Sequence, residues 1–241
     1  MQTMKTQEGL RRTYRSNGSS IPPESAESIP FDFRPLPGWK RVLDLIAILL
    51  TAPLWLPAMI CISLWITAIS RGPIFFIQER VGLYGRPFMM LKFRSMKAHA
   101  ETDRHEEHFN RLVESNCPMI KLDAAGDGRM IFCGWILRAA GLDELPQIFN
   151  VLRGEMSLVG PRPCTVRELP KFQEWQLERF NACPGLTGHW QVNGKNKTTF
   201  SRMIELDIFY AKNLSLWLDL AIILKTIPAL FAQVRESQAV R

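Results

Sequence analysis

The sequence predicts a mostly helical protein in which one membrane helix is joined to a small soluble domain that also contains a pair of strands. Residues 45–69 form an apolar run without a charged side chain. Residues 73–78 and 87–93 are short apolar segments on either side of a turn. Much of the remaining chain has helical periodicity with glycine and proline stops. At 241 residues the chain is long enough for one sizeable core beside the membrane element.

Charge and cysteine usage narrow the class of protein. The formal net charge of +7 indicates an acidic partner, either nucleic acid, anionic lipid head groups or a phosphorylated substrate. We expect no nucleic-acid partner, because no recognisable nucleic-acid motif or aromatic platform accompanies the charge. The five cysteines are odd in number and contain no C-x-x-C pair, so neither a disulfide framework nor a zinc site is expected. This favours a soluble part that faces the reducing cytoplasm.

The two ends of the chain are expected to be tails. Residues 1–37 are rich in Ser, Pro, Gln, Thr and Arg and have no apolar h-region, so they predict a disordered segment rather than a signal peptide. Residues 235–241 form a short C-terminal tail.

The apolar run has the length of a spanning helix, about 37 Å at about 1.5 Å per residue. Trp39, Lys40 and Arg41 precede it and would anchor a helix at the level of the lipid head groups. Pro53 and Pro57 lie near its middle, and each removes a backbone donor, so a bend is expected there.

The charges that flank the run indicate how it sits in the bilayer. Residues 1–41 carry seven Lys/Arg against four Asp/Glu, and residues 71–97 carry six against one. Because basic flanks stay in the cytoplasm, residues 38–71 are expected to form a re-entrant helix-break-helix. A plain spanning anchor remains the alternative.

Two cations in the second strand segment are candidates for phosphate binding. Lys92 and Arg94 flank Phe93, so an extended chain would direct both to one side. Residues 98–115 are expected to form an exposed acidic helix, and the two histidines in it one turn apart lack further ligands for a metal site.

A pair of adjacent carboxylates follows the next helix. Residues 129–140 predict a helix stopped by Gly141, and a second helix is expected to begin near Asp143 with Pro146 in its first turn. Asp143 and Glu144 would then lie at a helix N-terminus, where the dipole favours an ionised carboxylate that can serve as nucleophile or magnesium ligand. The alternative is an ordinary capping feature.

Two arginines accompany the carboxylates. Arg138 lies one turn before Gly141, and Arg162 is fixed between Pro161 and Pro163, which lowers the entropy lost when it binds a phosphate. Farther on, residues 214–234 form an apolar helix with a stripe at Trp217, Leu220, Leu224, Ile227 and Leu230. That helix either lies flat in the membrane interface or packs on the soluble core.

Taken together, these residues resemble the bacterial sugar transferases, which are monotopic polyprenyl-phosphate phosphoglycosyl transferases. The resemblance extends from about Lys40 to Phe231. It is carried by the following segments: Lys40 to Asp44, Lys92 to Met96, Leu142 to Gln147, Asn150 to Gly154, Met156 to Pro163, Pro184 to Gly194, and Leu206-Asp207 with Tyr210.

The resemblance implies an α/β, mostly helical fold in which the membrane helix breaks at Pro53 and residues 72–234 form a cytoplasmic catalytic domain with an interfacial C-terminal helix. It also implies that Asp143 attacks the β-phosphate of a UDP-sugar, expels UMP and forms a phosphosugar-aspartyl intermediate, which a polyprenyl (undecaprenyl) phosphate accepts. Glu144 would assist, and Mg²⁺ would bind at or beside Asp143. The phosphate- and substrate-binding set would be Lys92, Arg94, Arg138, Pro161, Arg162 and Pro163.

The implied location is the cytoplasmic face of the bacterial inner membrane, where the first membrane step of exopolysaccharide or glycan synthesis takes place. UDP-glucose or UDP-galactose is the preferred donor, membrane lipid is a partner, and a homodimer is left open. Ala52 stands where relatives often carry Ser, so a hydroxyl at the break would come from Thr51, and Lys195 stands where Arg is common. The competing hypothesis is a non-catalytic basic adaptor that binds anionic lipid at the membrane surface.

Overall fold

The computed structural model describes residues 31, 35–96, 130–132, 134–194 and 198–239, and the expected helix over residues 98–115 lies outside them. The elements in chain order are α2 (Gly38–Ile69), β1 (Phe75–Val81), β2 (Pro87–Phe93), α4 (Gly134–Ala139), α5 (Gln147–Arg153), β3 (Ser157–Val159), β4 (Gly185–Thr187), α6 (His189–Val192), α7 (Phe200–Lys212) and α8 (Leu216–Ala239). Short 3₁₀ helices occupy Leu83–Gly85, Leu142–Glu144, Leu169–Lys171 and Glu174–Asn181. The described part is mostly helical with two two-stranded sheets.

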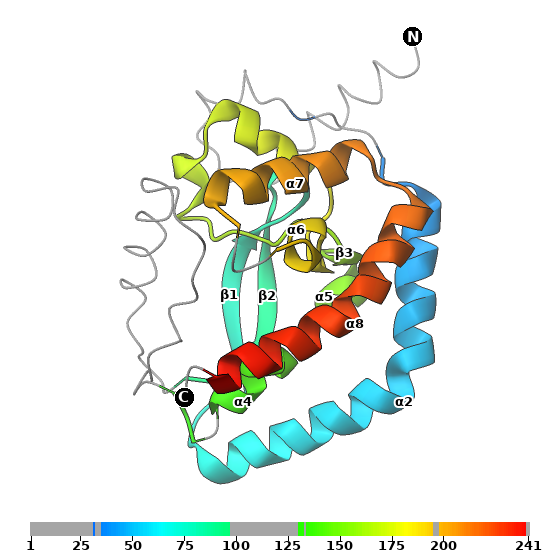
Figure 1. Ribbon diagram of the computed structural model, residues 1–241. Coiled ribbons are helices and arrows are strands. Elements are labelled where there is room, and N and C mark those ends of the chain that lie inside the picture. Colours follow the sequence, from blue (N-terminus) through cyan, green and yellow to red (C-terminus); the bar gives the residue numbers. More distant parts are fainter. Residues whose placement is uncertain (1–30, 32–34, 97–129, 133, 195–197, 240–241) are drawn as a thin grey trace.

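Helix α2 turns sharply near its middle, so that its two halves run in different directions (Figure 1). Pro53 and Pro57 lie inside it. Two residues before Pro53, the Thr51 hydroxyl donates to the Ala47 carbonyl at 2.7 Å, and two residues after it the Trp55 indole donates to the Ile48 carbonyl at 3.0 Å. The carbonyls that lose their helical donors to Pro53 and Pro57 are those of Leu49 and Pro53, so these two bonds support the helix before the break and do not replace the missing donors. The bend agrees with a helix-break-helix, but the Thr51 hydroxyl bonds to the Ala47 and Ile48 carbonyls and to neither carbonyl that the prolines free, so the expectation that it satisfies the break is wrong.

The first turn of α2 is docked on the soluble domain. Lys40 is 2% exposed, and Arg41 donates to the Leu152 carbonyl at 2.6 Å and to the Val151 carbonyl. The expectation that both cations anchor the helix at the lipid head groups is therefore wrong for Lys40, because its ammonium lies inside the protein.

Strands β1 and β2 form the antiparallel hairpin that the sequence predicted. Its register pairs Phe76 with Lys92 and Arg80 with Phe88. The connection contains Tyr84 at φ 55°. This left-handed conformation is uncommon in residues other than glycine, and the tight turn requires it.

Strands β3 and β4 are parallel and short, and they bring two loops into close backbone contact. The Gly160 amide donates to the Thr187 carbonyl at 2.8 Å, and the Gly185 amide donates to the Pro161 carbonyl at 2.9 Å. A Cβ at Gly160 would lie 2.0 Å from the Cys183 carbonyl oxygen, so only glycine fits there. This packing fixes the segment Gly160–Pro163, which we call the arginine loop.

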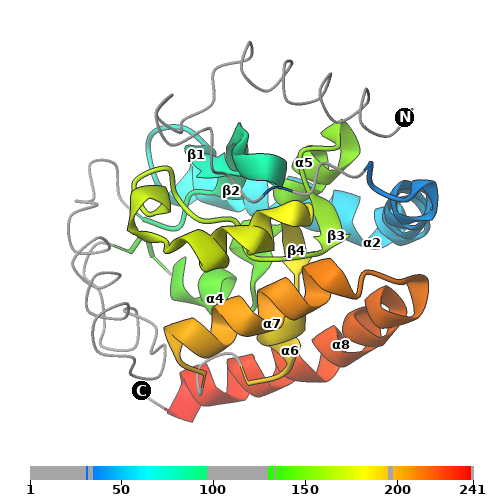
Figure 2. The same ribbon diagram turned by 90° about the horizontal axis from the view of Figure 1, so that it is seen from above.

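Helices α7 and α8 lie beside each other on one side of the molecule (Figure 2). Helix α8 crosses from the start of α2 to α4 (Figure 1). It buries Asp219, Ile222 and Gln233 and leaves exposed an apolar stripe that includes Trp217, Leu224, Ile227, Leu230 and Phe231. The core-packing alternative is confirmed for the buried face, and the exposed apolar face leaves the interfacial alternative a prediction. Helices α2 and α8 are each long and apolar enough to cross a membrane, by length and composition only.

The two expected tails differ from the structure where it describes them. Phe31 is 4% exposed and packs in a core cluster with Tyr84 and Phe180. Helix α8 continues to Ala239, past the expected start of a C-terminal tail at residue 235.

Candidate active site

The two adjacent carboxylates lie in a tight turn between α4 and α5. Gly141 adopts φ 70° and ends α4, and Leu142–Glu144 then form one 3₁₀ turn. The expected helix start at Asp143 is wrong: Pro146 is the N-cap residue, and α5 begins at Gln147. A 3₁₀ turn has three residues per turn, so neighbouring side chains diverge. Asp143 and Glu144 accordingly have different surroundings.

Glu144 is engaged by two cations. Its Oε1 accepts a hydrogen bond from Arg162 Nη2 at 2.8 Å and one from Lys92 Nζ at 3.1 Å. Burial alone would raise the pKa of Glu144, but the positive charges of Arg162 and Lys92 outweigh burial and hold that pKa well below its usual range. Glu144 is therefore an ionised carboxylate that orients two cations.

Asp143 has no such partner. It is 8% exposed, and its carboxylate accepts no hydrogen bond from any of the residues that the structure describes. Burial raises the pKa of Asp143, the charge of Lys92 opposes this, and the charge of Glu144 adds to it. The expectation that a helix dipole keeps Asp143 ionised is not met, because the residue precedes the α-helix and desolvation dominates. Adjacent positions in the chain do not tell the two carboxylates apart, whereas the structure gives them different surroundings.

Buried side chains hold the backbone of the arginine loop through hydrogen bonds. Arg179, 2% exposed, donates through Nη2 to the Arg162 carbonyl at 2.8 Å and to Asp207 Oδ2 at 2.6 Å. Arg80 Nη1 donates to the Pro163 carbonyl at 3.3 Å. These bonds fix the backbone on either side of the Arg162 side chain, which reaches Glu144.

A small pocket with about 230 Å³ of unfilled space, part of it open to solvent, lies beside Lys92, Glu144 and Arg162. It is lined by Arg80, Met90, Lys92, Glu144, Gln147, Arg162, Pro163 and Gly185. Arg80 was missed as a site residue, although one signal points to it. Residues directly opposite in a hairpin share a face, so the register that pairs Arg80 with Phe88 places Arg80 on the face that carries Lys92.

The structure brings together some of the predicted phosphate ligands and separates another. Lys92 and Arg162 meet at Glu144. Arg138 lies in the last turn of α4, where its charge lowers the pKa of Asp143 against the effect of burial. Arg94 is elsewhere: its guanidinium donates to the Arg71 carbonyl at 2.9 Å and the Ser70 carbonyl at 2.8 Å, at the end of α2.

Asp143 does not line the pocket but is the neighbour of Glu144, which does, and its carboxylate suits a divalent cation that binds together with a phosphate. Mg²⁺ is held in many proteins by one or two carboxylates, with water and substrate phosphates as the remaining ligands. The Asp143 carboxylate has no hydrogen-bond donor among the described residues and so has oxygens to offer. Those residues contain no cluster of three or more His, Cys, Asp or Glu side chains that would hold a metal without substrate.

The chain is similar to a known family over most of its length. A family model described as bacterial sugar transferase matches residues 37–233. The exopolysaccharide production protein ExoY of Rhizobium meliloti is 37% identical over 201 residues, which cover 81% of this chain and 87% of that protein. A UDP-glucose:undecaprenyl-phosphate glucose-1-phosphate transferase of Caulobacter vibrioides is 41% identical over 203 residues, or 79% of this chain and 69% of that protein.

Other relatives are much longer than the matched region. The UDP-galactose-lipid carrier transferase of Erwinia amylovora is 39% identical over 194 residues, which are 78% of this chain but only 39% of that protein. The matched region includes every residue of the pocket.

Proposed function

This chain belongs to the bacterial sugar transferase family, and on that basis we propose that it transfers a sugar-1-phosphate from a UDP-sugar to a membrane polyprenyl phosphate and releases UMP. The observation that carries the proposal is the nearly buried Asp143 carboxylate, which has no hydrogen-bond donor among the described residues and lies beside Glu144, Lys92 and Arg162. A free carboxylate next to fixed cations is the arrangement that in-line attack on a diphosphate needs.

In the first half-reaction an Asp143 oxygen attacks the β-phosphorus of the UDP-sugar. A new oxygen–phosphorus bond forms, the bond from that phosphorus to the bridging oxygen breaks, and UMP leaves with the electron pair. Burial raises the pKa of Asp143. Attack requires the ionised form, which Arg138, Arg162 and Lys92 favour by their charge.

In the second half-reaction a phosphate oxygen of the polyprenyl phosphate attacks the same phosphorus. The acyl-phosphate bond to Asp143 breaks, which regenerates the carboxylate and gives a polyprenyl diphosphate sugar. The acceptor phosphate lies at the head-group level, so the carboxylate must be held near that depth. Helix α2 and the apolar face of α8 would provide this placement.

The cations have distinct tasks in this proposal. Arg162 and Lys92, oriented by Glu144, stabilise negative charge that develops on the phosphoryl oxygens. Arg80 and Arg138 bind the remaining phosphate oxygens of the donor. Asp143 would hold Mg²⁺ together with the donor phosphates, and the bound ion would offset negative charge at the diphosphate. Pro161 and Pro163 limit the backbone freedom of the arginine loop.

The proposed location is the cytoplasmic face of the bacterial inner membrane. Both basic flanks of α2 stay on that side if the bent helix enters and leaves through the same leaflet. The stripe of α8 that includes Trp217, Leu224 and Phe231 would then lie in the interface. A UDP-hexose is the preferred donor, and a homodimer is compatible with the proposal.

A donor panel tests the proposal. The full chain in lipid, supplied with undecaprenyl phosphate and a series of UDP-sugars, should release UMP with one of them. Asp143→Asn should abolish release, and mass spectrometry of enzyme mixed with donor alone should find a phosphosugar adduct on Asp143. Chelation of Mg²⁺ by EDTA should stop release, and added Mg²⁺ should restore it. A lipid-binding adaptor would instead bind anionic vesicles and release no UMP.

A further inference from the structure

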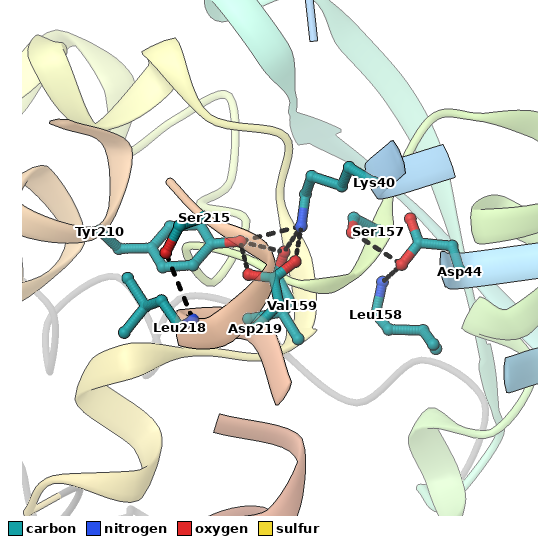
Figure 3. Close-up of polar contacts among 9 residues, drawn as sticks. All are labelled: Lys40, Asp44, Ser157, Leu158, Val159, Tyr210, Ser215, Leu218 and Asp219. Carbon is teal, nitrogen blue, oxygen red and sulfur yellow. Dashed lines mark hydrogen bonds and ion pairs between the residues drawn. The ribbon is translucent and has the colours of Figure 1, made fainter. Parts of the chain in front are cut away.

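A buried charged network joins the start of the membrane helix to the start of α8 (Figure 3). The Lys40 ammonium donates to Asp219 Oδ2 at 2.7 Å, to the Tyr210 hydroxyl at 2.8 Å and to the Val159 carbonyl at 2.9 Å. The Tyr210 hydroxyl in turn donates to Asp219 Oδ1 at 2.6 Å. We call this set the Lys40 network.

The network is complete, since each polar group in it has its partners. An ammonium has three protons, and all three have acceptors. Both oxygens of Asp219 are used, and Asp219 and Tyr210 are fully buried. A buried ion pair of this kind stabilises a fold little more than apolar residues would, but it fixes one geometry. The question is which part of the protein that geometry serves.

The Val159 carbonyl, which accepts from Lys40, shows which part of the protein the network positions. Val159 is the last residue of β3, and the next residue is the first of the arginine loop. The Lys40 network therefore holds the carbonyl on which the loop begins. Arg179, paired with Asp207, holds the carbonyl of Arg162, the residue before the last one of the loop. Asp207 and Tyr210 lie about one turn apart on α7, so one helix carries a residue of each of these two interactions.

We infer that Lys40, Tyr210 and Asp219 are positioning residues for the transfer reaction, because they fix the carbonyl of Val159 and thereby the direction in which Arg162 approaches the phosphate. This inference rests on the proposed function. It also gives the first turn of the membrane helix a direct mechanical connection to the active-site loop.

Asp44 offers a matched control in the same helix. Its Oδ1 accepts from Ser157 Oγ at 3.0 Å and from the Leu158 amide at 3.0 Å (Figure 3). Asp44 thus docks α2 on β3 just before Val159 but holds no part of the arginine loop. If docking of α2 were all that mattered, Asp44 and Tyr210 variants would behave alike.

A double-mutant cycle tests the inference on the full chain in lipid, with kcat for UMP release expressed per folded protein. Tyr210→Phe should lower kcat roughly tenfold in the wild-type background and less than about twofold when Arg162 is already Ala. Asp44→Asn should change kcat by the same small factor in both backgrounds. A Tyr210→Phe effect that is absent, or equally large in both backgrounds, would overturn the inference.

Amide hydrogen exchange gives a readout that does not need activity. Tyr210→Phe should speed exchange in the peptide 160–165, while Asp44→Asn leaves that peptide at the wild-type rate. An unchanged exchange rate in Tyr210→Phe would contradict the inference that the Lys40 network fixes the arginine loop, whether or not the protein is a transferase. Absence of UMP release by the wild type would defeat the proposed function instead, and the exchange result would still stand.

Discussion

Removal of the charge on Glu144 should lower kcat without raising KM for the donor. In Glu144→Gln the side chain keeps its shape, but Arg162 and Lys92 lose the anion that orients them at 2.8 and 3.1 Å. Both cations stay free to bind ground-state phosphates, so KM should be unchanged or lower. Their fixed placement at the transition state is lost, so kcat should fall.

The magnitude follows from the geometry. Two unit charges about 3 Å apart interact by roughly 5 kcal/mol at an effective dielectric constant of about 20. Solvent screens part of this, because the Arg162 side chain is 40% exposed and that of Glu144 is 22% exposed. A net effect of about 2 kcal/mol, between the values for exposed and buried pairs, corresponds to a fall in kcat of roughly 30-fold.

The assay is UMP release over a range of donor concentrations, with a matched control on the surface. Glu205 pairs with Arg202 at 2.7 Å, but these side chains are 50% and 62% exposed. Glu205→Gln should therefore leave kcat within about twofold. A Glu144→Gln enzyme with normal kcat and raised KM would refute the reasoning, since it would make Glu144 a ground-state ligand.

Three further outcomes follow from the structure. Asp207→Ala leaves a cation buried without its anion beneath the arginine loop, so it should destabilise the fold by about 3 kcal/mol and lower the Tm by about 9 °C; a shift under about 2 °C in thermal unfolding would contradict this. Burial raises the pKa of Cys164 and Cys183 to about 12, so the reactive thiolate is absent near neutral pH. Both thiols should therefore resist iodoacetamide up to about pH 10 in the folded protein, while the unfolded chain should react from about pH 8. Mass spectrometry of the modified peptides measures the labelling, and equal labelling of the folded and unfolded states would count against the prediction. Replacement of Pro53 and Pro57 by Ala should straighten α2 and carry the N-terminal segment to the far side of the membrane in a fraction of molecules. Labelling of a cysteine placed before the helix measures this fraction, and labelling from the cytoplasmic side alone would show that these prolines do not set the topology.

Local features of the chain were predictable because they depend on neighbours in sequence. Two prolines within an apolar run predict a bend, and α2 is bent. Two apolar segments around Gly82 to Gly85 predict a hairpin, and β1 pairs with β2. Gly141 ends a helix in the structure as expected, because a left-handed residue stops the helical ladder. The helix after it began later than expected, because the turn at Asp143 tightened into a 3₁₀ helix.

Long-range pairing was not predictable, because hydrogen bonds and desolvation depend on residues far apart in the chain. Arg94 matched Lys92 in spacing, yet it binds the end of α2. Lys40 had the sequence context of a head-group anchor, yet it is buried against Asp219, 179 positions away. Only the fold shows these partners.

The sequence by itself determined that this protein has a bent apolar helix long enough to cross a membrane, a basic net charge, and two adjacent carboxylates followed by an arginine fixed between prolines. These features are set by side-chain chemistry and backbone restriction within a few residues. The tertiary structure alone decided that Glu144 is an ionised carboxylate paired with two cations, while Asp143 accepts no hydrogen bond from the part of the chain that the structure describes. The reason is physical: the state of a buried carboxylate is set by the charges around it in space, and Lys92 and Arg162 reach Glu144 from 52 and 18 positions away.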